Sequence, residues 1–224
     1  MKQAAQKPRW SHWQRYMWNG GTLSTAGGLV FQGDNEGWIT GYDAADGRQL
    51  WRFNAGLGII APPVSYRWRG VQYVSILVGW AGPNPYGHAL MPTGWRYNAQ
   101  PRRLLTFRLG STAKLPPTAP YDETVHPVDD TAMTLVPADV AAGGKLFINC
   151  VACHGGQAES GGAPGPDLRE SGVPLDPAAF RQVVHDGALL PKGMPQFQNF
   201  TEEQLLQLRS YIRQMARNEV ARQA

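Results

Sequence analysis

Two cysteines and one histidine form the group of residues whose spacing has the clearest chemical meaning in this sequence. Cys150 and Cys153 are separated by two residues, and His154 follows directly. Two thiols at this spacing can reach the two vinyl groups on one edge of a porphyrin as thioethers, and the next residue can place an imidazole beneath the iron. The pattern predicts one covalent c-type haem, attached through Cys150 and Cys153, with His154 as an axial ligand.

The cysteine pair has two other interpretations. The thiols could form a redox-active dithiol, because cysteines three positions apart occur in disulfide oxidoreductases. They could also be half of a zinc site, but such a site needs further ligands and the chain has only these two cysteines. The histidine directly after Cys153 favours haem attachment over both alternatives.

A second axial ligand is expected downstream of the cysteines. Met194 lies between a glycine and a proline, just before the last predicted helix. A thioether ligand raises the reduction potential and leaves no open position on the iron, which suits electron transfer. Met133 lies near a linker, Met215 fits the apolar stripe of a helix, and His185 is more typical of a helix end. We therefore expect Met194 to be the second ligand.

The elements that position these residues are predicted to be helices, over residues 138–224. Asp139 is expected to cap a first helix, and Asp176 a second helix with Pro177 at its first position. Thr201 begins a capping box for a third helix. Apolar residues then recur at helical spacing, at Leu205, Leu208, Ile212 and Met215. This part is predicted to be a small all-α domain whose core a covalent haem completes.

Residues 1–82 are predicted to form strands instead. Short apolar runs separated by Gly-rich turns cover residues 29–33, 38–42, 49–53 and 73–78. Short strands at such close and even spacing are typical of a sandwich, a barrel or a propeller. Residues 83–137 are rich in proline, which interrupts regular structure, and they are predicted to be a linker with one further strand at about residues 103–109.

Charge and composition exclude several classes of function. The formal net charge is +4 and the pI is about 9.2, which favours acidic partners. The sequence has no block of basic residues interleaved with aromatic ones, so we expect no nucleic-acid partner. It has no apolar run long enough to span a bilayer, and we expect no transmembrane segment. The first eighteen residues have no apolar core of the kind found in a signal peptide.

Residues 138–224 resemble class I cytochrome c. In that family a glycine on the first helix packs against an aromatic residue on the last helix, and Gly143 or Gly144 with Tyr211 matches those places. The carbonyl of a proline after the haem motif accepts a hydrogen bond from the axial histidine in that family. Pro166 matches this role, and the bond would fix the orientation of the His154 ring.

The strand half resembles the last blade of a quinoprotein propeller. Residues 43–51, which contain Gly47 and Trp51, are similar to the tryptophan-docking motif, in which the tryptophan packs between blades and the glycine makes a turn. Residues 18–33 and 72–80 are similar to the final blade of alcohol dehydrogenases that depend on pyrroloquinoline quinone (PQQ). A propeller, a Pro-rich linker and a cytochrome c domain, in this order, is the arrangement of the PQQ-dependent quinohaemoprotein alcohol dehydrogenases.

This resemblance implies a fold and a size. The fold class is a multidomain α+β chain, with part of an eight-bladed β-propeller over residues 1–82, a linker over 83–137 and an all-α class I cytochrome c domain over 138–224. The family has about eight blades and this chain little more than one, so it is expected to be a C-terminal fragment or a split product. No catalytic residue or calcium ligand is assigned here, because those belong to the earlier blades. In that family, the positions that Trp18, Gly82 and Pro83 match line the PQQ pocket. Alternatively, Trp18 packs between blades, and Gly82 and Pro83 belong to a plain turn.

The resemblance also implies a function. In the intact enzyme PQQ, held with calcium, would oxidise an alcohol, and the haem would pass the electrons to an external acceptor, such as a blue-copper protein, another cytochrome or a membrane quinone pool. The missing part of the propeller would be a further partner. Haem attachment to this motif takes place outside the cytoplasm in bacteria, which predicts a periplasmic protein. The alternatives are a non-enzymatic c-type cytochrome with a β-rich extension, and a haem enzyme with an open iron position.

Overall fold

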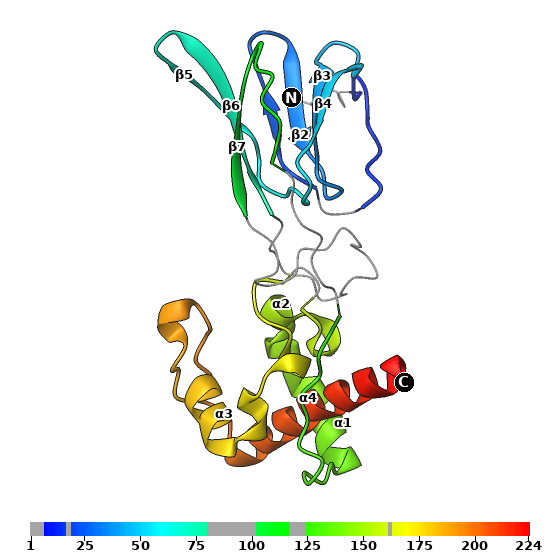
Figure 1. Ribbon diagram of the computed structural model, residues 1–224, viewed down its shortest axis with the longest axis vertical. Helices are drawn as coiled ribbons and strands as arrows, with labels where there is room; N and C mark the ends of the chain where they lie inside the picture. Colours follow the sequence, from blue (N-terminus) through cyan, green and yellow to red (C-terminus); the bar gives the residue numbers. More distant parts are fainter. Residues whose placement is uncertain (1–6, 17–18, 80–101, 117–123, 161–162) are drawn as a thin grey trace, which may run out of the picture. The chain divides into compact units, whose positions relative to one another are not determined.

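The computed structural model describes residues 7–16, 19–79, 102–116, 124–160 and 163–224 (Figure 1). The described residues fall into two compact units. A strand unit holds the described residues up to 116, and a helical unit holds those from 124 onward.

The strand unit contains two antiparallel sheets. The first sheet has the strand order β1-β2-β3-β4 and the second β5-β6-β7. The strands of the first are β1 (Thr22–Ser24), β2 (Leu29–Gly33), β3 (Trp38–Asp43) and β4 (Gln49–Asn54). Those of the second are β5 (Val64–Trp68), β6 (Val71–Val78) and β7 (Arg103–Arg108). The predicted runs correspond to β2, β3, β4 and β6, and β7 confirms the further strand expected within residues 83–137.

One core joins the two sheets of the strand unit. Its buried members are Ile39, Ala55, Leu57, Ile59, Ile76 and Val78, with Phe53, Leu105 and Phe107 packed against them. Trp51 of β4 meets the ring of Phe107 of β7 edge-on, with 5.0 Å between the ring centroids. The tryptophan of the predicted docking motif therefore connects one sheet to the other.

Gly47 makes a turn between β3 and β4, as the docking motif predicts. Its φ is +77°, and a Cβ atom at this position would lie 2.6 Å from the indole of Trp10. The indole Nε1 of Trp10 donates a hydrogen bond to the carbonyl of Ala44 at 3.0 Å. The turn thus receives a tryptophan from the N-terminal segment, a contact that the sequence analysis did not identify.

The helical unit consists of α-helices joined by short 3₁₀ turns. The α-helices are α1 (Pro137–Leu146), α2 (Val151–His154), α3 (Pro177–Val184) and α4 (Glu202–Gln223). The 3₁₀ turns are η2 (Phe147–Asn149), η3 (Gly156–Ala158), η4 (Leu168–Glu170), η5 (Val173–Leu175) and η6 (Leu190–Lys192). No described helix is both long and apolar enough to cross a bilayer.

The sequence predicted two of the three helix starts correctly. The Asp176 carboxylate accepts hydrogen bonds from the backbone N–H groups of Ala178 and Ala179, and Thr201 forms the expected capping box with Gln204. The expected cap at Asp139 is wrong. Val136 is the N-cap of α1 and makes no side-chain cap bond, and Asp139 lies inside the first turn. Pro137 sets the start, because its fixed φ suits the first helical position.

Helices α1 and α4 cross at two glycines, as the resemblance to cytochrome c predicts. A Cβ atom on Gly143 would lie 2.0 Å from the carbonyl oxygen of Gln207, and one on Gly144 would lie 3.2 Å from the ring of Tyr211. The absence of side chains therefore lets the two backbones approach closely.

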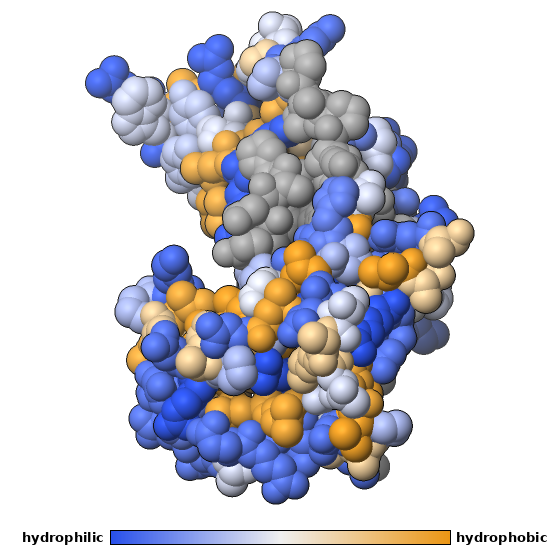
Figure 2. Space-filling model, turned by 60° about the horizontal axis from the view of Figure 1, so that its bottom comes forward, coloured by the Kyte–Doolittle hydropathy of each residue, from blue (hydrophilic) through white to orange (hydrophobic). Residues whose placement is uncertain are grey.

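The core of the helical unit lies against α4. Its buried members are Phe147, Ala158, Phe180, Val184, Leu205, Leu208 and Ile212. Met215 packs against this core, as predicted from its place on the apolar stripe. Exposed apolar side chains also remain on this unit, at Val136, Ile148, Leu190, Leu206 and Val220. Figure 2 shows patches of apolar surface among the polar surface of the helical unit.

A strap, residues 124–133, lies along the helical unit before α1 begins. The Val128 N–H donates to the carbonyl of Arg169 at 2.9 Å, and Arg213 donates to the carbonyl of Val128. Arg217 pairs with Asp129 at 2.7 Å. The strap belongs to the Pro-rich stretch that was predicted to be a linker, and it contacts α4.

Candidate haem site

A single tight turn presents the two cysteines and the histidine. Cys150 is the residue between η2 and α2, and its carbonyl accepts hydrogen bonds from the N–H groups of Cys153 at 3.1 Å and His154 at 2.9 Å. Both cysteines are free thiols of intermediate exposure. The turn therefore places two thiols and an imidazole within five consecutive residues, with no disulfide between the cysteines.

The thiol of Cys150 is not a reactive thiolate. Burial, and then the charge of the neighbouring Cys153 thiolate, raises its pKa from 9.0 to about 12. Reactive cysteines have the opposite environment, which lowers the pKa and exposes the sulfur. This argues against the redox-active dithiol. The zinc interpretation also finds no support, because the described residues contain no group of three or more His, Cys, Asp or Glu side chains that could hold a metal.

His154 is buried with one ring nitrogen engaged. Its Nδ1 lies 2.9 Å from the carbonyl oxygen of Pro166, as the resemblance to cytochrome c predicted. A carbonyl can only accept, so Nδ1 carries the proton and Nε2 keeps its lone pair. Burial lowers the pKa of His154, although the bond to Pro166 and the charge of Asp167 oppose this shift. The imidazole is thus held neutral and oriented, as a metal ligand needs to be.

Gly165 allows the loop of Pro166 to lie close to the histidine. Its N–H donates to the carbonyl of Cys153 at 2.7 Å. A Cβ atom at this position would lie 2.7 Å from the same carbonyl oxygen and 2.9 Å from the His154 ring. The sequence analysis missed this residue, although a glycine next to the proline was visible in the sequence.

Met194 lies on a turn that follows η6. Gly193 has a left-handed backbone, with φ of 92°, and the Met194 N–H donates to the carbonyl of Leu189 at 3.3 Å. The Met194 side chain is half-buried and packs against the core cluster that Cys150 also contacts. The fold therefore brings residues 44 positions apart in the sequence to one hydrophobic cluster, while the contact of Met194 with iron stays a prediction.

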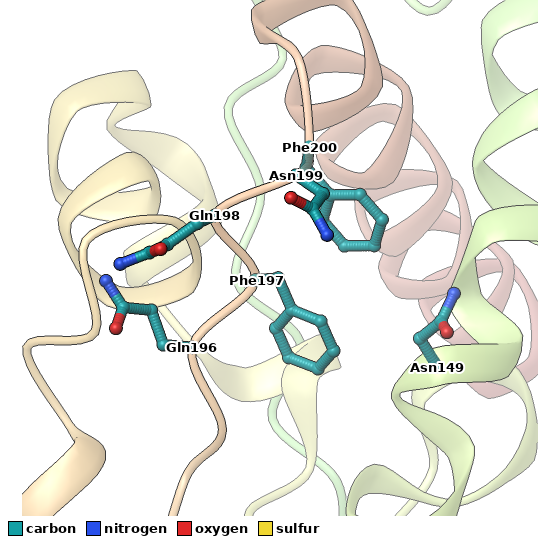
Figure 3. Close-up of a pocket in the computed structure, with 6 residues that line it drawn as sticks. All are labelled: Asn149, Gln196, Phe197, Gln198, Asn199 and Phe200. Atoms are coloured by element: carbon teal, nitrogen blue, oxygen red, sulfur yellow. The ribbon is translucent and has the colours of Figure 1, made fainter.

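A pocket of about 410 Å³ opens between the residue before Cys150 and the segment after Met194. Asn149 lines one side, and the segment of residues 196–200 lines the other. Figure 3 shows the rings of Phe197 and Phe200 on the side of the segment that faces Asn149. The two rings are stacked, with centroids 5.3 Å apart and an angle of 7° between their planes.

These residues fit a covalently attached haem. The site offers two unpaired thiols on one turn and an imidazole whose Nε2 lone pair is free. A covalent haem needs both of these features, namely attachment through thiols and an axial ligand.

The other residues considered for a site have different outcomes. Trp18, Gly82 and Pro83, matched to the PQQ pocket, lie outside the described residues. His185 ends α3, and its Nδ1 lies 2.6 Å from a carboxylate oxygen of Asp186, as expected for a helix-end histidine.

Two protein families match the chain. Residues 138–212 match the family described as cytochrome c oxidase, cbb3-type, subunit III. Residues 1–74 match the β-propeller domain family of glucose, ethanol and alcohol dehydrogenases that is named for PQQ. The matches confirm the predicted fold class, propeller strands followed by an all-α cytochrome c domain.

Whole proteins with both parts are also similar to the chain. The quinohaemoprotein alcohol dehydrogenase ADH IIB of Pseudomonas putida is 40% identical over 211 residues, which cover 92% of this chain and 30% of that protein. The 1-butanol dehydrogenase (cytochrome c) of Thauera butanivorans is 40% identical over 215 residues, which cover 92% of this chain and 29% of that protein.

A solved structure gives the same result. The quinohaemoprotein alcohol dehydrogenase ADHIIG of Pseudomonas putida HK5 matches with a TM-score of 0.69 and 38% identity, over 91% of this chain and 29% of that one. The chain thus spans about 30% of the length of these relatives. It is a relative of the quinohaemoprotein alcohol dehydrogenases and corresponds to their C-terminal part, in which residues of the PQQ β-propeller family precede a cytochrome c domain.

Proposed function

We propose that this chain is the electron-transfer part of a PQQ-dependent alcohol dehydrogenase. Cys150 and Cys153 hold a covalent haem c, and His154 and Met194 are its axial ligands. The observation that carries the proposal is the hydrogen bond of 2.9 Å between His154 Nδ1 and Pro166, which leaves Nε2 available on the turn that also presents both thiols.

The ligand set decides which chemistry the site performs. A bound haem supplies one-electron transfer. If His154 and Met194 both held the iron, the protein itself would occupy both positions left by the porphyrin, and neither peroxide nor an organic substrate would have access to the iron. The proposal therefore favours an electron relay over a haem enzyme with an open coordination position. A neutral axial thioether also raises the reduction potential, which helps the site accept electrons.

The alcohol dehydrogenase activity would belong to the longer protein. Its relatives carry names such as 1-butanol dehydrogenase (cytochrome c), which support an alcohol as the source of electrons. In that protein PQQ would lie in the propeller near Trp18, Gly82 and Pro83, and calcium would be held by the earlier blades. An external blue-copper protein, cytochrome or quinone pool would accept the electrons. We place the protein in the periplasm, because the haem of this motif is attached outside the bacterial cytoplasm.

The first experiment tests the haem and its methionine ligand together. The chain is produced in a bacterium competent in cytochrome c maturation, and its mass and absorption spectra are measured. We expect one covalently added haem and a low-spin reduced spectrum. Met194→Ala should give a high-spin, five-coordinate reduced iron, whereas the control Met133→Ala should keep the low-spin spectrum. A protein without added haem would refute the proposal, and a low-spin Met194→Ala variant would refute the assignment of Met194.

A further inference from the structure

The loop that carries Pro166 is closed by buried polar groups. Ser160 donates its hydroxyl to the carbonyl of Gly165, and its N–H donates to Asp167 Oδ2 at 3.3 Å. Asp167 Oδ1 accepts the N–H of Arg169 at 3.0 Å. Pro166 therefore lies between two residues that are each tied by hydrogen bonds. The carboxylate of Asp167 is the tie on the C-terminal side, and it is buried.

Arg169 binds this carboxylate in a bidentate fork. Its Nε donates to Asp167 Oδ1 at 3.0 Å, and one terminal nitrogen donates to Asp167 Oδ2 at 2.7 Å. The other terminal nitrogen donates to Glu219 of α4 at 2.9 Å. The side chains of all three residues are only 6–7% exposed. The guanidinium thus connects the loop of Pro166 to the last helix.

The charges of this cluster keep Arg169 ionised. Burial alone would lower the pKa of Arg169, but its hydrogen bond to Asp167 and the charges of Asp167, Glu159 and Glu219 outweigh burial, and its pKa is raised. A buried ion pair adds little net stability, because desolvation cancels most of the attraction. A rigid fork between planar groups does, however, define geometry well. A positional role accounts for this cluster better than a stabilising one.

We propose that Arg169 is a positioning residue for the axial histidine, because its fork on Asp167 fixes the Pro166 carbonyl that accepts the His154 Nδ1–H bond. The inference rests on the proposed haem ligation by His154. A fixed acceptor strengthens the bond, and a stronger bond makes the imidazole a better electron donor to the iron. Loosening the fork should therefore weaken this donation and shift the reduction potential to more positive values.

The test variant is Arg169→Lys in the haem-loaded protein, because lysine keeps the charge but cannot form the fork. The matched control is Arg181→Lys, which changes an arginine of α3 that is 40% exposed and pairs with Glu202 at the start of α4. We measure hydrogen exchange of His154 Nδ1–H by NMR in the reduced state, together with the midpoint potential. Arg169→Lys should exchange about tenfold faster or more and have a more positive potential, and Arg181→Lys should match the unaltered protein. Unchanged exchange and potential in Arg169→Lys would overturn the inference.

If Arg169→Lys fails to fold or to take up haem, a measurement on the unaltered protein tests the inference instead. If the fork holds the Pro166 carbonyl, Arg169 Nε–H and His154 Nδ1–H become exposed in the same local opening. The two protons should then show the same opening free energy in hydrogen exchange. A tenfold difference between the two opening constants corresponds to about 1.4 kcal/mol of opening free energy. A difference of that size or larger would overturn the inference. Absence of covalent haem from the unaltered protein would instead refute the proposed function itself.

Discussion

His154 shows how a single proton prepares a residue for its chemistry. The Pro166 carbonyl can bond only to a protonated Nδ1, and this leaves Nε2 as the sole lone pair of the ring. Burial keeps the imidazole neutral by lowering its pKa. The histidine therefore has the tautomer and the charge state that a metal ligand needs.

Cys150 should be protected against alkylation before haem attachment. With a pKa of about 12 instead of 9.0, its thiolate fraction at pH 8 is about a thousandfold smaller, and the thiolate is the nucleophile. We expect iodoacetamide to modify Cys150 about a thousandfold more slowly in the folded haem-free chain than in the same chain in urea. Pulse alkylation of the unaltered chain, followed by mass spectrometry that locates the label on Cys150 or Cys153, measures this ratio at Cys150. Equal rates in the two conditions would show that the thiol is not buried.

Helices α1 and α4 approach each other closely where α1 has two glycines, Gly143 and Gly144. A methyl group on Gly143 would overlap the backbone of α4, while one on Gly144 would press on the ring of Tyr211. The crossing holds α1 in place, and the chain continues from α1 through η2 to Cys150. The position of the attachment turn thus depends on this contact.

Gly143→Ala should destabilise the helical unit. The added Cβ atom, 2.0 Å from the Gln207 carbonyl oxygen, forces the helices apart, and overpacking of this kind costs about 1–3 kcal/mol. Urea denaturation of the haem-loaded protein measures the loss. Gly172→Ala is the control, because Gly172 has a φ of −74° and open space around its Cβ position. A Gly143→Ala variant as stable as Gly172→Ala would contradict the close approach.

The N-terminus of α4 makes a second, smaller contribution. The Thr201 hydroxyl accepts the N–H of Gln204 at 3.2 Å, and the Gln204 side chain accepts the N–H of Thr201 at 3.0 Å. Thr201→Ala removes one of these bonds and should lower the free energy of unfolding by about 1 kcal/mol. Thr201→Ser keeps the hydroxyl and should retain most of the stability. If both variants unfold at the same urea concentration, the cap does not contribute.

Some sequence signals were sufficient to predict where a helix or strand lies, and others were not. Asp176 and Thr201 were identified because their cap residues lie next to a regular apolar pattern. Strand β5 was missed, although its apolar residues Val64, Tyr66 and Trp68 alternate with Ser65 and Arg67. A second signal was the two-residue turn of Arg69 and Gly70, both with positive φ, that joins β5 to β6. The run is short and all of its residues are exposed, so it contributes no buried face.

At the scale of the whole molecule, the strap of residues 124–133 extends the helical unit beyond its helices. Arg213 is fully buried and donates to the carbonyl of Val128, as well as to carbonyls of Leu168 and Ser171. Arg217 holds the strap at Asp129 and at the carbonyls of Asp130 and Met133. The strap therefore accepts hydrogen bonds from two arginines of the last helix.

Removal of the strap should weaken the helical unit. A fragment of residues 134–224 lacks the Val128 carbonyl, and an unsatisfied buried donor costs about 1–3 kcal/mol. We expect this fragment to unfold at a lower urea concentration than one of residues 124–224, both carrying haem. Asp129→Asn in the full chain provides a milder test of the Arg217 contact. Identical midpoints for the two fragments would show that the strap is not part of the folded unit.

The attachment turn was predicted from the spacing of residues close together in the chain, and the Pro166 bond from the resemblance to class I cytochrome c. It did not predict the link from Arg169 to Glu219, because the two residues are 50 positions apart and surface arginines and glutamates are common. Trp10 was missed for the same reason, since its partner turn at Gly47 lies far along the chain. Local spacing carries the chemistry, whereas long-range pairing appears only in the folded molecule.

Strand β5 lies at an edge of its sheet, and all of its residues are exposed, including Tyr66 and Trp68. An exposed strand edge with aromatic side chains is a template for pairing with another chain. This exposed edge should lower the solubility of the purified protein. Concentrated stocks should form aggregates through β5, and a lysine in place of Tyr66 should extend the shelf life of the sample.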